Sequence, residues 1–179
     1  MSRQISILHF LRTGNFGPLR LGTTAQAVHD LIGAPDAWAD FRGAVTCWQS
    51  ELWKYGDFEF HFSRDEPESR LTLIHLDDGP WGGGTANDVP TGGARLRIDS
   101  WVIRAGMSLE TFTQALSTEG IDVGLVDWPF DDNTTRLRTC AGVEILFIDK
   151  PGESDPPPGL CMITFASHHT HPLKEPIDA

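Results

Sequence analysis

The chain has 179 residues, of which 40% are hydrophobic and 22% are charged, and its formal net charge is −11. This length and composition suit a globular protein with a buried core, built as one domain or as two small units. The 14 Lys and Arg residues stand against 25 Asp and Glu residues, which argues against nucleic acid as a partner because a phosphate backbone binds basic patches.

The sequence predicts a cytoplasmic protein that does not span a membrane. No stretch reaches the about 18 consecutive apolar residues of a membrane helix. The apolar stretch within residues 1–10 is short and is interrupted by His9, and no cleavage site of a secretory signal follows it. The three cysteines, Cys47, Cys140 and Cys161, form no C-x-x-C pair, so neither a zinc site nor a redox pair is indicated.

Two helices are predicted in the first third of the chain. Residues 6–12 are apolar at helical spacing, and Gly14 is placed to end that helix. A second helix follows Gly22, with Thr23 or Thr24 as the N-cap whose side-chain oxygen accepts from a free backbone N–H. Its apolar residues fall on one face: Ala25, Val28, Leu31 and Ile32.

A meander of three strands is predicted after this helix, over residues 46–55, 58–62 and 71–76. Gly56-Asp57 is typical of a tight hairpin turn between the first two strands. The second strand alternates between apolar and polar residues, which predicts one buried face. Its apolar positions are Phe58, Phe60 and Phe62.

Residues 79–94 are rich in Gly and Pro and are predicted to be a flexible connector. They contain neither a Gly-Lys-Ser/Thr sequence nor a G-x-G-x-x-G sequence that opens a helix, so a phosphate-binding loop is not indicated. Residues 1–78 and 95–166 are the predicted units on either side, and residues 167–179 are a predicted flexible tail.

The second unit resembles the first. Gly106 and Ser108 follow Gly22 and Thr24 at a distance of 84 residues, and the apolar helix face recurs. The recurring helix positions are Leu109, Phe112, Ala115 and Leu116. The recurring strand positions are Val143, Ile145 and Phe147, then Leu160, Met162 and Ile163. We therefore predict an α+β fold: a tandem duplication of a helix plus a three-stranded antiparallel meander, with the units sharing or abutting one sheet.

Several residues are candidates for chemistry, each beside a plainer alternative. His168, His169 and His171 could bind a divalent metal, but they lie in the predicted tail without helical spacing. Glu59 and Glu144 occupy equivalent strand positions and could act as acid and base, although a solvated sheet face is the more common role for such a pair. No metal and no cofactor is therefore assigned.

Tryptophan is the more informative residue type, because six tryptophans are too many for two small cores. Exposed aromatic side chains are typical anchors of protein-binding surfaces. The predicted partner-binding residues are Trp53, Tyr55, Trp81, Glu59 and Glu144. Trp38, by contrast, is expected to fold back onto the core.

The repeated unit resembles the helix-plus-three-strand module of the BamE family, and its tandem arrangement is similar to that of beta-lactamase inhibitory proteins. The similar stretches in the first unit are residues 22–24, 31–36 and 56–60, with Val28. In the second unit Gly120-Ile121-Asp122 replaces the Gly-x-Pro-Asp ending. The resemblance implies a non-enzymatic protein-binding scaffold. Because this chain has neither a secretion signal nor a disulfide framework, it is closer to a cytoplasmic immunity or antitoxin-like protein.

The function predicted from the sequence is a non-enzymatic protein-binding module, with a toxin that has a basic surface as one candidate partner. The alternative is a small metal-dependent hydrolase or ligand-binding protein with a site between the repeats. A third reading is a homodimer formed by pairing of strand edges.

Overall fold

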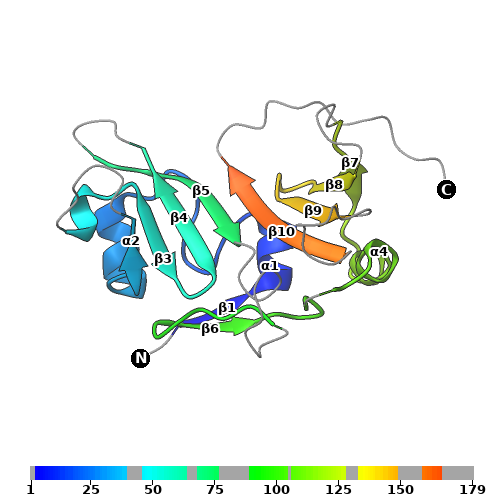
Figure 1. The fold of residues 1–179 in the computed structure, drawn as a ribbon, viewed down its shortest axis with the longest axis horizontal. Coiled ribbons are helices and arrows are strands. Elements are labelled where there is room, and N and C mark those ends of the chain that lie inside the picture. Colours follow the sequence, from blue (N-terminus) through cyan, green and yellow to red (C-terminus); the bar gives the residue numbers. More distant parts are fainter. Residues whose placement is uncertain are drawn as a thin grey trace.

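The computed structural model describes residues 3–39, 46–63, 68–76, 89–104, 106–127, 133–148 and 159–166. These residues form an α+β fold with three α-helices, an eight-stranded antiparallel sheet and a two-stranded parallel sheet (Figure 1). The helices are α1 (Ile7–Thr13), α2 (Ala25–Ile32) and α4 (Leu109–Thr118), with a short 3-10 helix η1 (Cys47–Gln49). The strands are β1 (Arg3–Ser6), β2 (Ala37–Trp38), β3 (Leu52–Tyr55), β4 (Phe58–Phe62), β5 (Leu71–Leu76), β6 (Leu96–Asp99), β7 (Val123–Leu125), β8 (Thr134–Thr139), β9 (Glu144–Ile148) and β10 (Gly159–Ala166).

The large sheet has the order β2-β3-β4-β5-β10-β9-β8-β7. The third predicted strand of each half, β5 and β10, therefore meet at the centre, where His75 lies opposite Thr164. On both sides of this pair the strands follow outward in reverse chain order. One helix precedes each set of four strands, α2 for the first set and α4 for the second.

Both helix starts confirm the predicted N-caps. Thr24 Oγ1 accepts from the N–H of Ala27 at 3.2 Å, and Ser108 Oγ accepts from the N–H of Thr111 at 3.2 Å. Each side chain satisfies a backbone donor that has no partner within its helix. The first helix also ends as predicted, because Gly14 adopts the left-handed conformation with φ 71° and donates to a carbonyl in the last turn.

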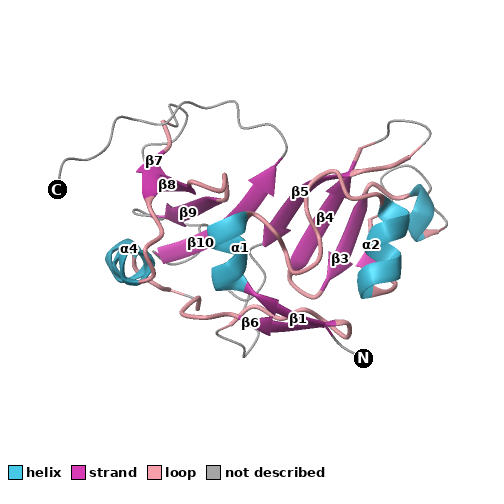
Figure 2. Ribbon diagram, turned by 180° about the vertical axis from the view of Figure 1, so that it is seen from behind, coloured by secondary structure: helices cyan, strands magenta, loops and turns pink. Residues whose placement is uncertain are grey.

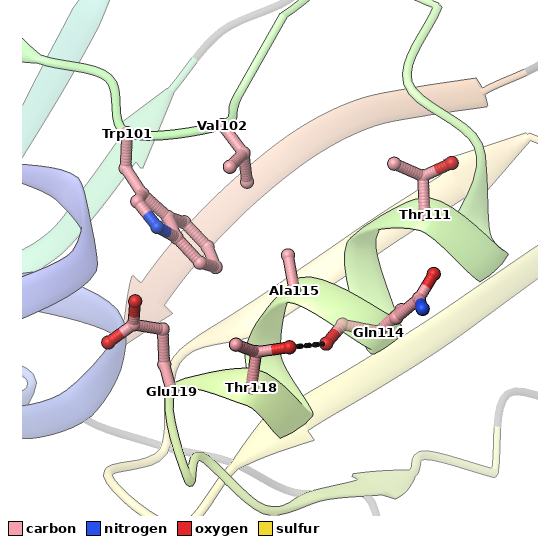
Figure 3. A pocket seen from close by; sticks show the side chains of 7 residues that line it. All are labelled: Trp101, Val102, Thr111, Gln114, Ala115, Thr118 and Glu119. Carbon is pink, nitrogen blue, oxygen red and sulfur yellow. Dashed lines mark hydrogen bonds between the residues drawn. The ribbon is translucent and has the colours of Figure 1, made fainter.

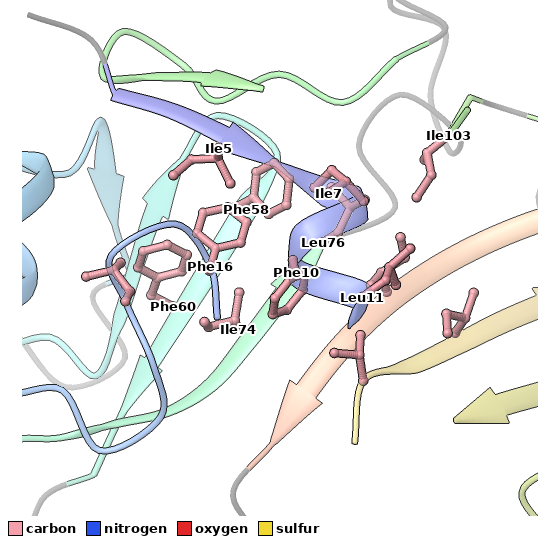
Figure 4. Packing of buried hydrophobic residues seen from close by; sticks show 14 of the residues in the cluster. Ile5, Ile7, Phe10, Leu11, Phe16, Phe58, Phe60, Ile74, Leu76 and Ile103 are labelled. Carbon is pink, nitrogen blue, oxygen red and sulfur yellow. The ribbon is translucent and has the colours of Figure 1, made fainter. Parts of the chain in front are cut away.

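The helices pack on one face of the sheet (Figure 2). The buried hydrophobic residues of both halves form a single cluster. At its centre α1 and the following turn join the two halves through aromatic contacts (Figure 4). The ring of Phe10 lies 6.0 Å from Phe165 of β10 and 5.4 Å from Phe16. Phe16 in turn lies 4.8 Å from Phe58 and 5.5 Å from Phe60 of β4. The N-terminal segment is thus part of the core shared by both halves.

Three features of the fold differ from the sequence prediction. The predicted strand over residues 46–55 is extended only in β3, because its first part forms the 3-10 helix η1. Each half has four strands of the large sheet instead of three, with β2 and β7 added at the edges. The parallel pairing of β1 with β6 joins segments far apart in the chain and has no local sequence signal.

Candidate functional site

The face of the large sheet opposite the helices is the candidate functional site, and we call it the open face. Side chains alternate across a strand, so the residues between the buried phenylalanines of β4 point to the open face. Cross-strand register aligns a polar row across six strands. From β3 to β8 this row is Lys54, Glu59, His75, Thr164, Glu144 and Arg138. No helix among the described residues covers it (Figure 1).

Glu59 lies in the first half of this row and forms two ion pairs at the surface. Its Oε1 lies 3.0 Å from Lys54 Nζ, and its Oε2 lies 3.3 Å from His61 Nε2. The Lys54 and His61 side chains are 36% and 38% exposed. The Glu59 side chain itself is 16% exposed. Ion pairs with partners as exposed as Lys54 and His61 contribute little to stability, and the role of Glu59 in partner binding stays a prediction.

Glu144 occupies the matching place in the second half but has a different environment. Its Oε1 accepts from Arg138 Nη2 at 2.6 Å and from Arg138 Nε at 3.0 Å. Arg136 Nη1 lies 3.8 Å from Oε2. The carboxylate side chain is only 10% exposed. The expectation of a solvent-facing glutamate is therefore wrong for Glu144, which is a buried charge held between two arginines.

Trp53 and Tyr55 belong to the core and not to a partner surface, which corrects the prediction for both. Trp53 is 1% exposed and packs between Trp48 and Phe62, while its Nε1–H donates to the carbonyl of Cys47 at 2.7 Å. Tyr55 is 0% exposed. The alternation of β3 explains both, because Lys54 between them points to the open face.

Among the tryptophans that the structure describes, the exposed ones are Trp38 and Trp48, neither of which was a predicted anchor. Trp38 is 42% exposed on the edge strand β2, so the expectation that it folds into the core is wrong. Trp48 is 48% exposed and stacks beside His29, with ring centroids 4.9 Å apart. Trp81, the remaining predicted anchor, lies outside the described residues.

The ionisation of Tyr55 at alkaline pH can be measured without interference from other tyrosines, because it is the single tyrosine of the chain. Its hydroxyl donates to the carbonyl of Gly33 at 2.8 Å, and burial raises its pKa well above the ordinary value near 10. As the pH rises, Tyr55 therefore ionises at a lower pH in the unfolded chain than in the folded protein. Its contribution to the free energy of unfolding is complete below about pH 10 and falls as the pH rises further.

We expect tyrosinate absorbance at 295 nm to stay absent in the folded protein at pH 10–11 and to appear together with unfolding. In Tyr55→Phe the alkaline loss of stability attributable to this group should disappear, at a cost of about 1 kcal/mol for the lost hydrogen bond. Ionisation of Tyr55 near pH 10 while the fold remains intact would contradict its burial.

The β3–β4 hairpin is held against residues 91–94, the end of the predicted connector. Asp36 Oδ2 accepts from the N–H of Gly56 at 3.0 Å, and its Oδ1 accepts from the N–H of Ala94 at 3.3 Å. Asp57 Oδ2 accepts from the N–H and the hydroxyl of Thr91 at 2.7 and 3.0 Å. This contact explains Asp36 of the Gly-x-Pro-Asp motif: its carboxylate satisfies backbone donors of the hairpin and of the connector.

Gly56 is required at this contact for two reasons. It has φ +60°, and a Cβ there would collide with the backbone of Thr91, Gly92 and Gly93. We expect Gly56→Ala to lower the free energy of unfolding by about 2–3 kcal/mol. Gly22→Ala is the matched control, because Gly22 also has positive φ but nothing lies within 4 Å of its added Cβ, so about 1 kcal/mol is expected. If urea denaturation gave equal losses in the free energy of unfolding for the two variants, the close packing of residues 91–93 against Gly56 would be contradicted.

The catalytic alternatives find little geometric support among the described residues. Glu59 and Glu144 lie on β4 and β9 with two strands between them, so their backbones are about 14 Å apart and they do not form a carboxylate pair. No cluster of three His, Cys, Asp or Glu side chains suited to a metal occurs in the described part of the chain. His168, His169 and His171 lie outside that part.

Comparisons with protein-family models, with curated proteins and with solved structures find no match for this chain. None of the helices in the described ranges is both long enough and apolar enough to cross a bilayer.

Proposed function

We propose that this chain is a non-enzymatic protein-binding module that binds another protein on the open face of its eight-stranded sheet. The observation that carries this proposal is the composition of that face. Half-buried apolar side chains flank the charged row, namely Leu73, Leu146 and Met162. A sheet face that no described helix covers and that combines apolar and charged side chains has the make-up of a protein–protein interface.

Charge supports a basic partner. The whole chain carries −11, which would steer a basic protein toward it over long range. The row itself is close to neutral, since Lys54 and Arg138 offset Glu59 and Glu144. We therefore propose that long-range attraction brings the partner in and that contacts on the open face select it, as expected for an inhibitor or immunity-type protein.

We also propose that the open face arose by tandem duplication. Three pairs of equivalent features, each 84 residues apart, support this duplication. They are the N-caps Thr24 and Ser108, the glycines Gly22 and Gly106 with positive φ, and two four-residue turns. These turns, 16–19 and 100–103, each close with a backbone hydrogen bond between their end residues. The mirrored strand order about β5 and β10 agrees with the same relation. A partner would then meet two related half-surfaces side by side.

The proposal is tested by affinity capture from the organism that carries the gene, with wild type compared against the double variant Leu73→Glu/Leu146→Glu. A matched control, Ser117→Glu, adds charge on exposed helix α4 instead. A specific partner should be retained by wild type and control and lost by the double variant. For a toxin partner, co-expression should restore growth with wild type alone or with the control. Retention by all three proteins would place the interface elsewhere and contradict the proposal.

A further inference from the structure

A shallow pocket of about 340 Å³ lies beside α4, on the helix side of the sheet and away from the open face. Figure 3 shows the Trp101 indole reaching over Ala115, with the Glu119 carboxylate next to the ring. Val102 continues the wall on the Trp101 side, and Thr111 lies across the pocket. The pocket thus combines an aromatic face with one acidic group.

The pocket exists because of two residues that differ between the halves of the chain. Ala115 lies seven residues after its N-cap, where Leu31 lies in α2, and the smaller side chain leaves space on the helix. Trp101 lies seven residues before the same N-cap, where the first half has Gly17. Both residues are left-handed, with φ 55° for Trp101 and 61° for Gly17.

The conformation of Trp101 is unfavourable for a residue with a side chain and costs on the order of 1–2 kcal/mol. Asp99 Oδ1 accepts from its N–H at 3.2 Å, and Phe112 supports its ring in an edge-to-face contact at 6.2 Å. Non-glycine residues held this way cluster at binding and active sites. The fold therefore fixes an indole at a position where the first half needs only a glycine.

The Glu119 carboxylate beside the indole can accept a further hydrogen bond from a ligand. Glu119 Oε2 accepts from Arg12 Nη2 at 3.2 Å, and the same nitrogen donates to the Glu119 carbonyl at 2.9 Å. Among the described residues no donor reaches Oε1, and no Lys or Arg stacks on the Trp101 ring. A planar cation is the ligand that satisfies both groups, since guanidinium stacks on aromatic faces and donates to carboxylates.

We propose that this pocket binds an arginine side chain of a partner polypeptide, with the guanidinium stacked on Trp101 and donating to Glu119 Oε1. The net charge of −11 favours a basic segment at this position. This site is independent of the open face, so its test does not depend on the outcome for the proposed function.

The test uses the full chain and two blocked amino acids, N-acetyl-arginine methylamide and its neutral isostere N-acetyl-citrulline methylamide, followed by NMR. The arginine compound should shift the Trp101 indole N–H and the amides of residues 111–119, with a Kd of about 1–10 mM. The citrulline compound should cause no saturable shift. Equal binding of the two compounds, or shifts elsewhere only, would overturn the proposal.

Two variants separate this site from a general effect on folding. Ala115→Leu fills the pocket with the side chain found at the same place in α2 and should weaken binding at least tenfold, with thermal stability kept. Glu119→Gln should weaken it about three- to tenfold. Unchanged binding in either variant would overturn the assignment. Free L-arginine binding more than tenfold tighter than the blocked compound would identify a small-molecule site and overturn the polypeptide partner.

Discussion

Replacing Phe16 by alanine is expected to lower the free energy of unfolding by about 3–5 kcal/mol, the range for large-to-small changes of buried aromatic residues. Phe16 is fully buried and contacts three other phenylalanine rings, one on α1 and two on β4. Its removal leaves a cavity where the N-terminal segment meets the sheet. Because α1 also contacts β10, the loss should affect both halves together.

The measurement is urea denaturation followed by tryptophan fluorescence and by far-UV circular dichroism. The two probes should give one coincident transition for Phe16→Ala, since a single core unfolds as one unit. Trp38→Ala is the control, because this exposed edge residue should cost less than about 1 kcal/mol. A loss below about 1.5 kcal/mol for Phe16→Ala, or two separate transitions, would contradict the shared core.

Replacing Glu144 by alanine is the second change with a large expected effect, again about 3–5 kcal/mol. The substitution removes a carboxylate that accepts twice from Arg138 and lies 3.8 Å from Arg136, so two mostly buried arginines lose a compensating negative charge. Replacing both members of the Arg138–Glu144 pair by apolar residues, as in Arg138→Met/Glu144→Leu, should recover much of the loss, because neither member of that pair is then left buried without the other.

Glu59→Ala is the matched control for Glu144→Ala, because Glu59 holds the same place in the other half of the row. Its partners are more exposed, so a cost of about 1 kcal/mol or less is expected. Equal losses for the two glutamates in thermal and chemical denaturation would contradict the claim that the burial of their basic partners determines the cost.

Local features of this fold were predictable, because neighbouring residues determine them. Thr24 and Ser108 were predictable as N-caps, because in each case a side-chain hydroxyl precedes an apolar helix face. The two-residue turn Gly56-Asp57 joins β3 and β4 as expected. The alternation of Phe58 and Phe60 with polar residues defined the buried face of β4. The same rule applied to Lys54 would have shown that Trp53 and Tyr55 are buried.

Other features depend on contacts between distant segments and have no local signal. Glu144 is buried because β8 brings Arg138 opposite it, which its own neighbours in the chain do not reveal. The pairing of Arg3–Ser6 with Leu96–Asp99 is likewise a tertiary contact. The pocket at Trp101 depends on a left-handed tryptophan, a conformation that sequence patterns do not predict for this residue type.

Calorimetric titration of the captured partner tests the central claim, binding through the open face, most directly. The partner would be titrated into wild type, into Leu73→Glu/Leu146→Glu and into the control Ser117→Glu, with the fold of each variant checked by circular dichroism. The predicted result is a Kd at least about tenfold weaker for the double variant alone. An unchanged Kd for a folded double variant would contradict binding through the open face.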